Sequence, residues 1–308
     1  IAFGSRIEVV RNILASGATR LTVARRGDTM RRRRLTVVVY LVAAALVGCA
    51  TTVPYVGQGP HPQISRGRPV PVIDMLGNVF GLLSKLVLWE WKMNQHWVSE
   101  DTERYLVEYI DAPETITETT HYSLNEYAPG RALKRLIHNH KVAWPYRLLF
   151  GLPQTLVYDV LLPGRLFGGL IGGDNYNPYN DIVWIYSDHP AVALHEAGHS
   201  HDFNKRKYKG TYSLLRISVV GVLFQEYKAS EEAINGLETM SVPREVCSAY
   251  DILYPAYGTY VGNIFVPGGF VVGAAVGHIF GRMDSHRCRS GLRSQESTQA
   301  SSAIPATL

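Results

Sequence analysis

The fold is decided by one stretch, residues 181–199, which reads DIVWIYSDHPAVALHEAGH. Five of its first six residues are β-branched or aromatic, which is the composition of a strand. Ser187 or Asp188 can then cap the free amides of a helix start, and Pro190 suits the first helical turn. The stretch therefore predicts a strand that runs directly into a helix beginning at about Pro190.

The predicted helix carries an HExxH motif at residues 195–199. Side chains four residues apart share a helix face, so His195 and His199 can offer two imidazole nitrogens to one metal ion. Glu196 stands beside them, where its carboxylate can take a proton from a water molecule that the metal activates. The alternative is a pair of ordinary histidines on an amphipathic helix, because short motifs also arise by chance.

A catalytic zinc site needs three protein ligands and one open position, and HExxH supplies two. The downstream candidates for the third ligand are His201, Asp202, Glu226, Glu231, Glu232 and Glu238. The first two are too close to the motif and are rotated away from its face. The apolar run 214–224 leads into a second predicted helix, 225–233, which is the better source. Its other acids can equally form a solvated helix face.

Together the two helices resemble the active-site helices of gluzincin metallopeptidases, and among these the HtpX-like and CAAX-prenyl-protease family. That family carries Glu-x-x-Ala-Asp on its second helix, and this chain has EYKAS at residues 226–230. The resemblance covers about residues 181–237. It implies an α+β fold with a compact zincin-like domain, in which the HExxH helix packs on a small sheet beside a second, Glu-bearing helix. Helical and glycine-rich apolar segments complete the expected domain.

The resemblance also implies roles for single residues. Zn²⁺ would be held by His195, His199 and Glu226, with Glu231 or Glu232 as a fallback ligand, and Glu196 would act as the general base for hydrolysis of a peptide or protein substrate. Ser230 stands where the family has an acid that orients a ligand histidine. A serine hydroxyl can accept the same hydrogen bond, but it brings no charge.

The residues around Met30 predict where the protein is located. Four arginines follow it, then the uncharged apolar run 35–48, and then Cys49, which is the layout of a bacterial lipoprotein signal peptide. Cleavage before Cys49 and lipid on its sulfur would anchor the protein in the cell envelope, facing the periplasm, and Ala50 favours the outer membrane in a double-membraned cell. The alternative is an uncleaved signal anchor, for which the run is short.

This interpretation divides the chain into parts with different roles. We expect upstream translation at 1–29, a signal peptide at 30–48, a tether at 49–72, a metallopeptidase-like domain at 73–283 and a disordered tail at 284–308. Nine of the 31 basic and two of the 26 acidic residues precede Cys49, which leaves 22 basic against 24 acidic residues in the mature chain. That balance argues against a nucleic-acid partner.

Three further features leave alternatives open. Helical spacing of apolar residues predicts a helix over about 72–97. The stretch 256–281 is uncharged except for His278 and rich in glycine, so it suits either membrane contact or a buried helical hairpin. Cys247 and Cys288 can pair in an oxidising envelope, but their spacing does not decide it.

The hydrolase hypothesis needs a donor for the developing oxyanion, and Tyr186, His189 and Tyr227 are candidates that the sequence does not separate. Three other functions compete with hydrolysis. They are a non-catalytic zinc-binding lipoprotein, an envelope scaffold acting through the glycine-rich segments, and a quality-control factor that binds unfolded proteins without cleaving them.

Overall fold

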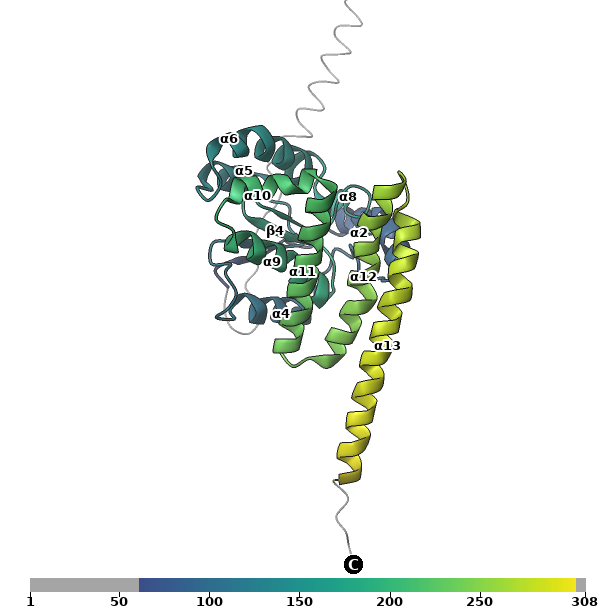
Figure 1. Ribbon diagram of the computed structural model, residues 1–308. Helices are drawn as coiled ribbons and strands as arrows, with labels where there is room; N and C mark the ends of the chain where they lie inside the picture. The colour runs from purple at the N-terminus through teal and green to yellow at the C-terminus, as the bar shows by residue number, and fades with distance from the viewer. Residues whose placement is uncertain (1–60, 303–308) are drawn as a thin grey trace, which may run out of the picture. The chain divides into compact units, whose positions relative to one another are not determined.

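The computed structural model describes residues 61–302, with side chains to residue 295 (Figure 1). The chain divides after Gly48, and every described element lies in the second part, Cys49–Leu308. The predicted signal peptide, lipidation site and upstream residues lie outside the described residues. The elements, in order, are β1 (Ile64–Arg66), α2 (Pro71–Phe80), α3 (Leu82–Leu88), α4 (Glu100–Ile110), β2 (His121–Leu124), α5 (Pro129–His138), α6 (Trp144–Tyr146), η1 (Arg147–Gly151), α7 (Leu152–Gln154), η2 (Thr155–Leu161), α8 (Gly164–Phe167), β3 (Asn175–Asn177), β4 (Ile182–Ile185), α9 (Pro190–Lys205), α10 (Lys209–Leu214), η3 (Leu215–Ile217), α11 (Val219–Thr239), α12 (Pro243–Phe265) and α13 (Phe270–Ser302).

A small mixed sheet lies at the centre of this mainly helical protein, so the predicted α+β class is confirmed in its coarse form. The strand order is β1-β2-β4-β3, with β1, β2 and β4 parallel and β3 antiparallel to β4. Successive side chains of β4 point to opposite faces. Ile182 and Trp184 pack with Ala132 of α5, whereas Val183 and Ile185 join the main core with α9. The sheet is therefore covered on both faces.

The helix α9 follows β4 as predicted, and every residue from 190 to 203 except His195 is buried. The capping prediction was wrong in detail. His189 is the cap, with its Nδ1 accepting from the amide of Ala191 at 3.2 Å. Asp188 instead accepts hydrogen bonds from Ser99 and Thr102 at the start of α4, so a contact distant in sequence takes its carboxylate away from α9.

Helix α11 packs against α9, and α12 and α13 form a long hairpin beside it (Figure 1). A disulfide joins Cys247 of α12 to Cys288 of α13, which settles the pairing that the sequence left open. The hairpin closes on glycines, since a Cβ at Gly273 would lie 2.0 Å from the carbonyl oxygen of Gly258. Helix α13 continues to Ser302, so residues 284–302 are helical where a disordered tail was expected.

The helix predicted over 72–97 is shorter and broken. It divides at Gly81 into α2 and α3, and it ends at Trp89, which has the left-handed φ of 51°. Among residues 61–302, no single helix has both the length and the hydropathy needed to cross a membrane. Helices α2 and α3, which are bent by 45°, meet those criteria only when taken as a pair.

Candidate metal centre

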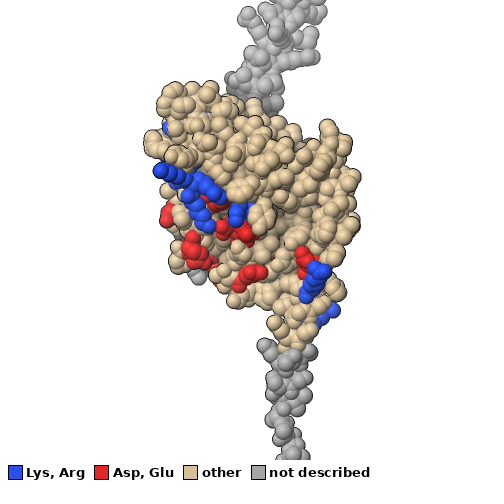
Figure 2. All heavy atoms as spheres, viewed as in Figure 1, with Lys and Arg blue, Asp and Glu red and all other residues tan. Residues whose placement is uncertain are grey.

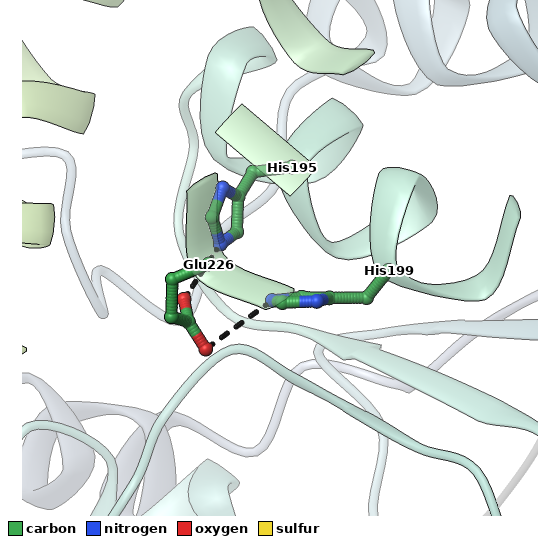
Figure 3. Close-up of side chains that lie close together, drawn as sticks. All are labelled: His195, His199 and Glu226. Carbon is green, nitrogen blue, oxygen red and sulfur yellow. Dashed lines mark hydrogen bonds and ion pairs between the residues drawn. The ribbon is translucent and has the colours of Figure 1, made fainter. Parts of the chain in front are cut away.

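Three side chains converge between α9 and α11 (Figure 3). His195 and His199 project from neighbouring turns of α9 toward the carboxylate of Glu226 on α11. Nε2 of His195 lies 3.2 Å from Oε2 of Glu226, and Nε2 of His199 lies 3.5 Å from Oε1. One ligand atom from each of the three lies within 4.8 Å of the other two. The structure thus brings together the three residues that the sequence proposed as ligands.

The close packing of α9 on α11 makes this convergence possible. Gly198 occupies a variable position of the motif, and a Cβ there would lie 3.0 Å from the carbonyl oxygen of Ala229. Ala229 itself is fully buried. Gly198 and Ala229 therefore face each other about one turn from Glu226. Their small size lets the two helices lie close enough for the Glu226 carboxylate to approach both histidines. The variable positions of HExxH have a packing role in this chain.

The electrostatics of the cluster suit a cation. Burial lowers the pKa of His199 to about 4, which leaves a neutral imidazole with a free lone pair. Burial also opposes the charged form of His195, but the hydrogen bond to Glu226 and the charge of Glu196 outweigh it and raise the pKa of His195. The pKa of Glu226 is held well below its usual range, because His199 and Arg216 outweigh the cost of burial. The third ligand candidate is therefore an ionised carboxylate.

Arg216 was not anticipated from the sequence. This residue of η3 donates to Oε1 of Glu226 at 2.8 Å, and the charge of Glu226 keeps its pKa raised despite burial. The other carboxylate oxygen of Glu226, Oε2, faces His195. Arg216 stands ten residues before Glu226 and not at helical spacing, so nothing local in the sequence links the two.

Glu196 lies beside the cluster on the wall of a cavity of about 440 Å³, which His195 and Glu226 also line. Burial raises the pKa of its carboxyl to about 8, and repulsion from Glu226 and Asp174 adds to the effect. A cation bound by the neighbouring ligands would favour the carboxylate instead. Glu196 can then hold or release one proton at the wall of the cavity.

Two polar side chains extend the cluster. Oγ of Ser230 lies 3.3 Å from Nδ1 of His195, on the opposite side of the ring from Glu226, so it can fix the orientation of the ring. Tyr260 of α12 lines the cavity, as Glu226 does. The negative charge of Glu226, together with burial, raises the pKa of Tyr260, which therefore stays protonated as a donor.

The structure separates the other candidates from the site. Glu231 pairs with Lys228, and Glu232 with Lys205, so both acids lie outside the ligand cluster. Glu238, the third of these acids, is exposed and is also outside the ligand cluster. None of the three oxyanion donor candidates is among the residues that line the cavity. Each donor candidate has another contact. Tyr186 bonds to Glu126, His189 to Ser248 and Tyr227 to Glu231.

Another part of the cavity wall comes from the loop of residues 169–174. Gly169 and Gly172 have φ of 86° and 80°, which glycine adopts without strain. Next to them, Asp174 accepts from the amides of Tyr186 and Ser187 at 2.6 and 2.9 Å and fastens the loop to the end of β4. The loop is therefore held over the cavity by the same strand that leads into α9.

The donor set fits a divalent cation. Three ligands at about 2.0–2.1 Å from a tetrahedral zinc ion would stand about 3.3 Å from one another. The nitrogens of His195 and His199 lie 3.2 and 3.5 Å from different oxygens of Glu226, and one ligand atom from each residue lies within 4.8 Å of the others, so the cluster approaches that spacing. Two imidazoles with one carboxylate also form the ligand set of known catalytic zinc sites. Other small divalent ions that bind imidazole nitrogen and carboxylate oxygen would fit the same geometry.

A comparison with known proteins found no matching family model, no matching curated protein and no matching solved structure. Function is therefore inferred from the site itself.

Proposed function

We propose that this protein is a lipid-anchored zinc metalloendopeptidase of the cell envelope, with a gluzincin-type site. The observation that carries the proposal is the convergence of His195, His199 and Glu226 beside a cavity whose wall includes His195, Glu226 and Glu196. The combination of ligands, a neighbouring carboxylate and space for a substrate is what metal-assisted hydrolysis requires.

Each residue has a defined task in this proposal. His195, His199 and Glu226 hold the ion, which when bound polarises a carbonyl group and lowers the pKa of water. Glu196 takes the proton from the attacking water and passes it to the leaving amine. Tyr260 supplies a hydrogen bond to the developing oxyanion, since it is a protonated donor on the cavity wall beside Glu226.

The cavity also favours a type of substrate. Away from the ligand cluster its walls are mainly apolar, with side chains from α3, α12 and the start of α13 that include Leu83, Val87, Ile252, Leu253 and Phe270. Peptides with apolar residues beside the scissile bond would bury them there. A charged residue at the same place would lose its hydration without a partner.

The test begins with metal content, measured by mass spectrometry on purified residues 50–308. We expect about one zinc ion in the wild type and in Glu196→Gln, and none in His199→Ala or Glu226→Ala. Glu231→Ala is the matched control on the same helix and should keep its zinc. Loss of zinc in Glu231→Ala with retention in Glu226→Ala would show that the ligand is wrongly chosen.

Proteolysis then distinguishes an enzyme from a structural zinc site. Glu196→Gln should keep the metal and lose hydrolysis of apolar peptides, because an amide cannot accept the proton.

The second candidate function is a non-catalytic zinc protein. The ion pair of Arg216 with Glu226 and the uncharged Ser230 favour it, because both features weaken the hold on a cation. Equal absence of turnover in the wild type and in Glu196→Gln, with zinc bound in both, would establish that alternative.

A further inference from the structure

Helix α11 begins at the same end of the molecule where α12 meets α13 (Figure 1), and the segments at this end carry many exposed apolar side chains. They come from three segments, 144–161, 215–224 and 261–272, and we call this surface the apolar end. Its most exposed members are Trp144, Leu149, Ile217, Val220, Phe265 and Val272, which are 65–79 % exposed. Isolated exposed apolar residues are ordinary, but a set of this size contributed by distant segments marks a contact surface.

Residues 144–161 form a continuous helical segment that lies across this end (Figure 1). Gly151, Thr155 and Asp159, spaced by four, are its buried residues. Its other side exposes an apolar stripe that includes Leu148 and Leu161. A helix that lies flat on a surface with one apolar face outward is the arrangement by which proteins enter the interfacial layer of a bilayer without crossing it.

The charged residues in the three segments are all paired with protein groups, although Arg216 remains exposed. Arg147 donates to the carbonyl oxygen of Leu136 at 2.8 Å, and Asp159 accepts from Asn177 at 2.8 Å. Arg216 binds Glu226, as described above, and the segment 261–272 contains no charged residue. Figure 2 shows the result, with the upper part of the visible face almost free of Lys, Arg, Asp and Glu. A protein surface facing water alone has no reason to remove its charges in this way.

We propose that the apolar end docks on a lipid bilayer, with the helical segment 144–161 and the α12–α13 turn in the interfacial layer. Two further observations favour lipid as the occupant. The stretch 205–209, from the end of α9 to the start of α10, has four basic residues, of which Lys205 and Arg206 pair with Glu232 and Asp202. Figure 2 shows basic side chains bordering the uncharged region, where anionic headgroups would lie. If Cys49, which lies outside the described residues, carries the expected lipid, the twelve residues from it to His61 span at most about 40 Å and would hold the body of the protein close to the bilayer.

Docking would place the metal-ligand cluster near the membrane. Glu226 lies seven residues after Val219, the first residue of α11, which is about 10 Å along the helix axis. The docking surface itself requires neither zinc nor hydrolysis, so it stands apart from the proposed enzyme activity.

The test is vesicle flotation with purified residues 50–308, which lack the leader and Cys49 but contain every described element and the whole core. Vesicles of phosphatidylcholine alone and of phosphatidylethanolamine with phosphatidylglycerol should both bind the protein, the anionic ones more tightly. The double variant Leu149→Glu/Phe265→Glu should lower the partition coefficient about a hundredfold, since two exposed apolar side chains leave the interface.

Ile116→Glu is the matched control, because Ile116 is a partly exposed apolar residue away from the apolar end. Its neighbour Thr115 lines a cavity together with Thr239, the last residue of α11. The control should bind vesicles like the wild type, and so should Glu196→Gln even if the enzyme proposal fails. The proposal is overturned if the wild type floats with neither vesicle, or if the double variant binds as well as the control. It is also overturned if the wild type dimerises in place of binding lipid and the double variant is monomeric, because the surface would then join two copies of the chain.

Discussion

Ser230 offers a sharp test of the metal centre, since its hydroxyl lies within hydrogen-bonding distance of a candidate ligand histidine. Its Oγ is 3.3 Å from Nδ1 of His195, and Nε2 of the same ring faces Glu226. When Nε2 binds a metal, Nδ1 carries the proton and donates it to this oxygen. A carboxylate would accept the same bond with about twice the strength and would add a negative charge near the cation.

We therefore expect Ser230→Asp to raise zinc affinity about 10- to 100-fold, or about 1.4–2.7 kcal/mol, the usual effect of a partner of a ligand histidine. Ser230 lines the cavity, so the extra atoms have space. The control is Ser230→Asn, because asparagine has the size of aspartate but carries no charge. Affinity is measured by competition with a zinc-binding dye at constant pH. Equal affinities for the Asp and Asn variants would refute the assignment of His195 as a ligand oriented by residue 230.

Three other expectations follow from the contacts described above. Gly273→Ala should destabilise the protein by about 1–3 kcal/mol in urea unfolding, because its Cβ would meet a carbonyl oxygen at 2.0 Å, whereas Gly130→Ala, with nothing within 4 Å, should be neutral or slightly stabilising. Burial raises the pKa of Asp159 to about 7, above its unfolded value, so this carboxyl favours the folded state at low pH and that contribution is lost as pH rises from about 4 to 7. Asp159→Asn should therefore gain stability over the wild type above pH 7, by up to about 4 kcal/mol, and a constant difference across pH would contradict this. Tyr260→Phe should lower kcat about 10²- to 10³-fold with zinc content unchanged, while Tyr227→Phe, outside the cavity, should leave kcat as it is.

The most accurate predictions from sequence were local. The strand before Pro190 and the helix after it were identified from β-branched composition and from helix-forming residues around the motif. The helix that carries Glu226 was also predicted, although it begins earlier than expected, at Val219. The break of α2 and α3 at Gly81 was missed, because the apolar spacing continues through it.

The side chains that complete the site were not visible in the sequence. Arg216 of η3 binds Glu226 and Tyr260 of α12 lines the cavity, and no periodicity connects either residue with the motif. The oxyanion candidates chosen for their nearness in sequence, such as Tyr186, instead bond elsewhere in the core. Sequence proximity was a poor guide, since side chains lining one cavity come from separate elements.

The sequence by itself determined the chemistry that is available. Helical periodicity places His195 and His199 on one face, and the residue types there are those that bind metals. Only the tertiary structure decided which acid joins them, that Cys247 pairs with Cys288, and that charged residues leave one end of the molecule. The physical reason is range. Propensity and periodicity describe contacts within about four residues, whereas the site, the disulfide and the apolar end are made by segments that meet only when the core forms.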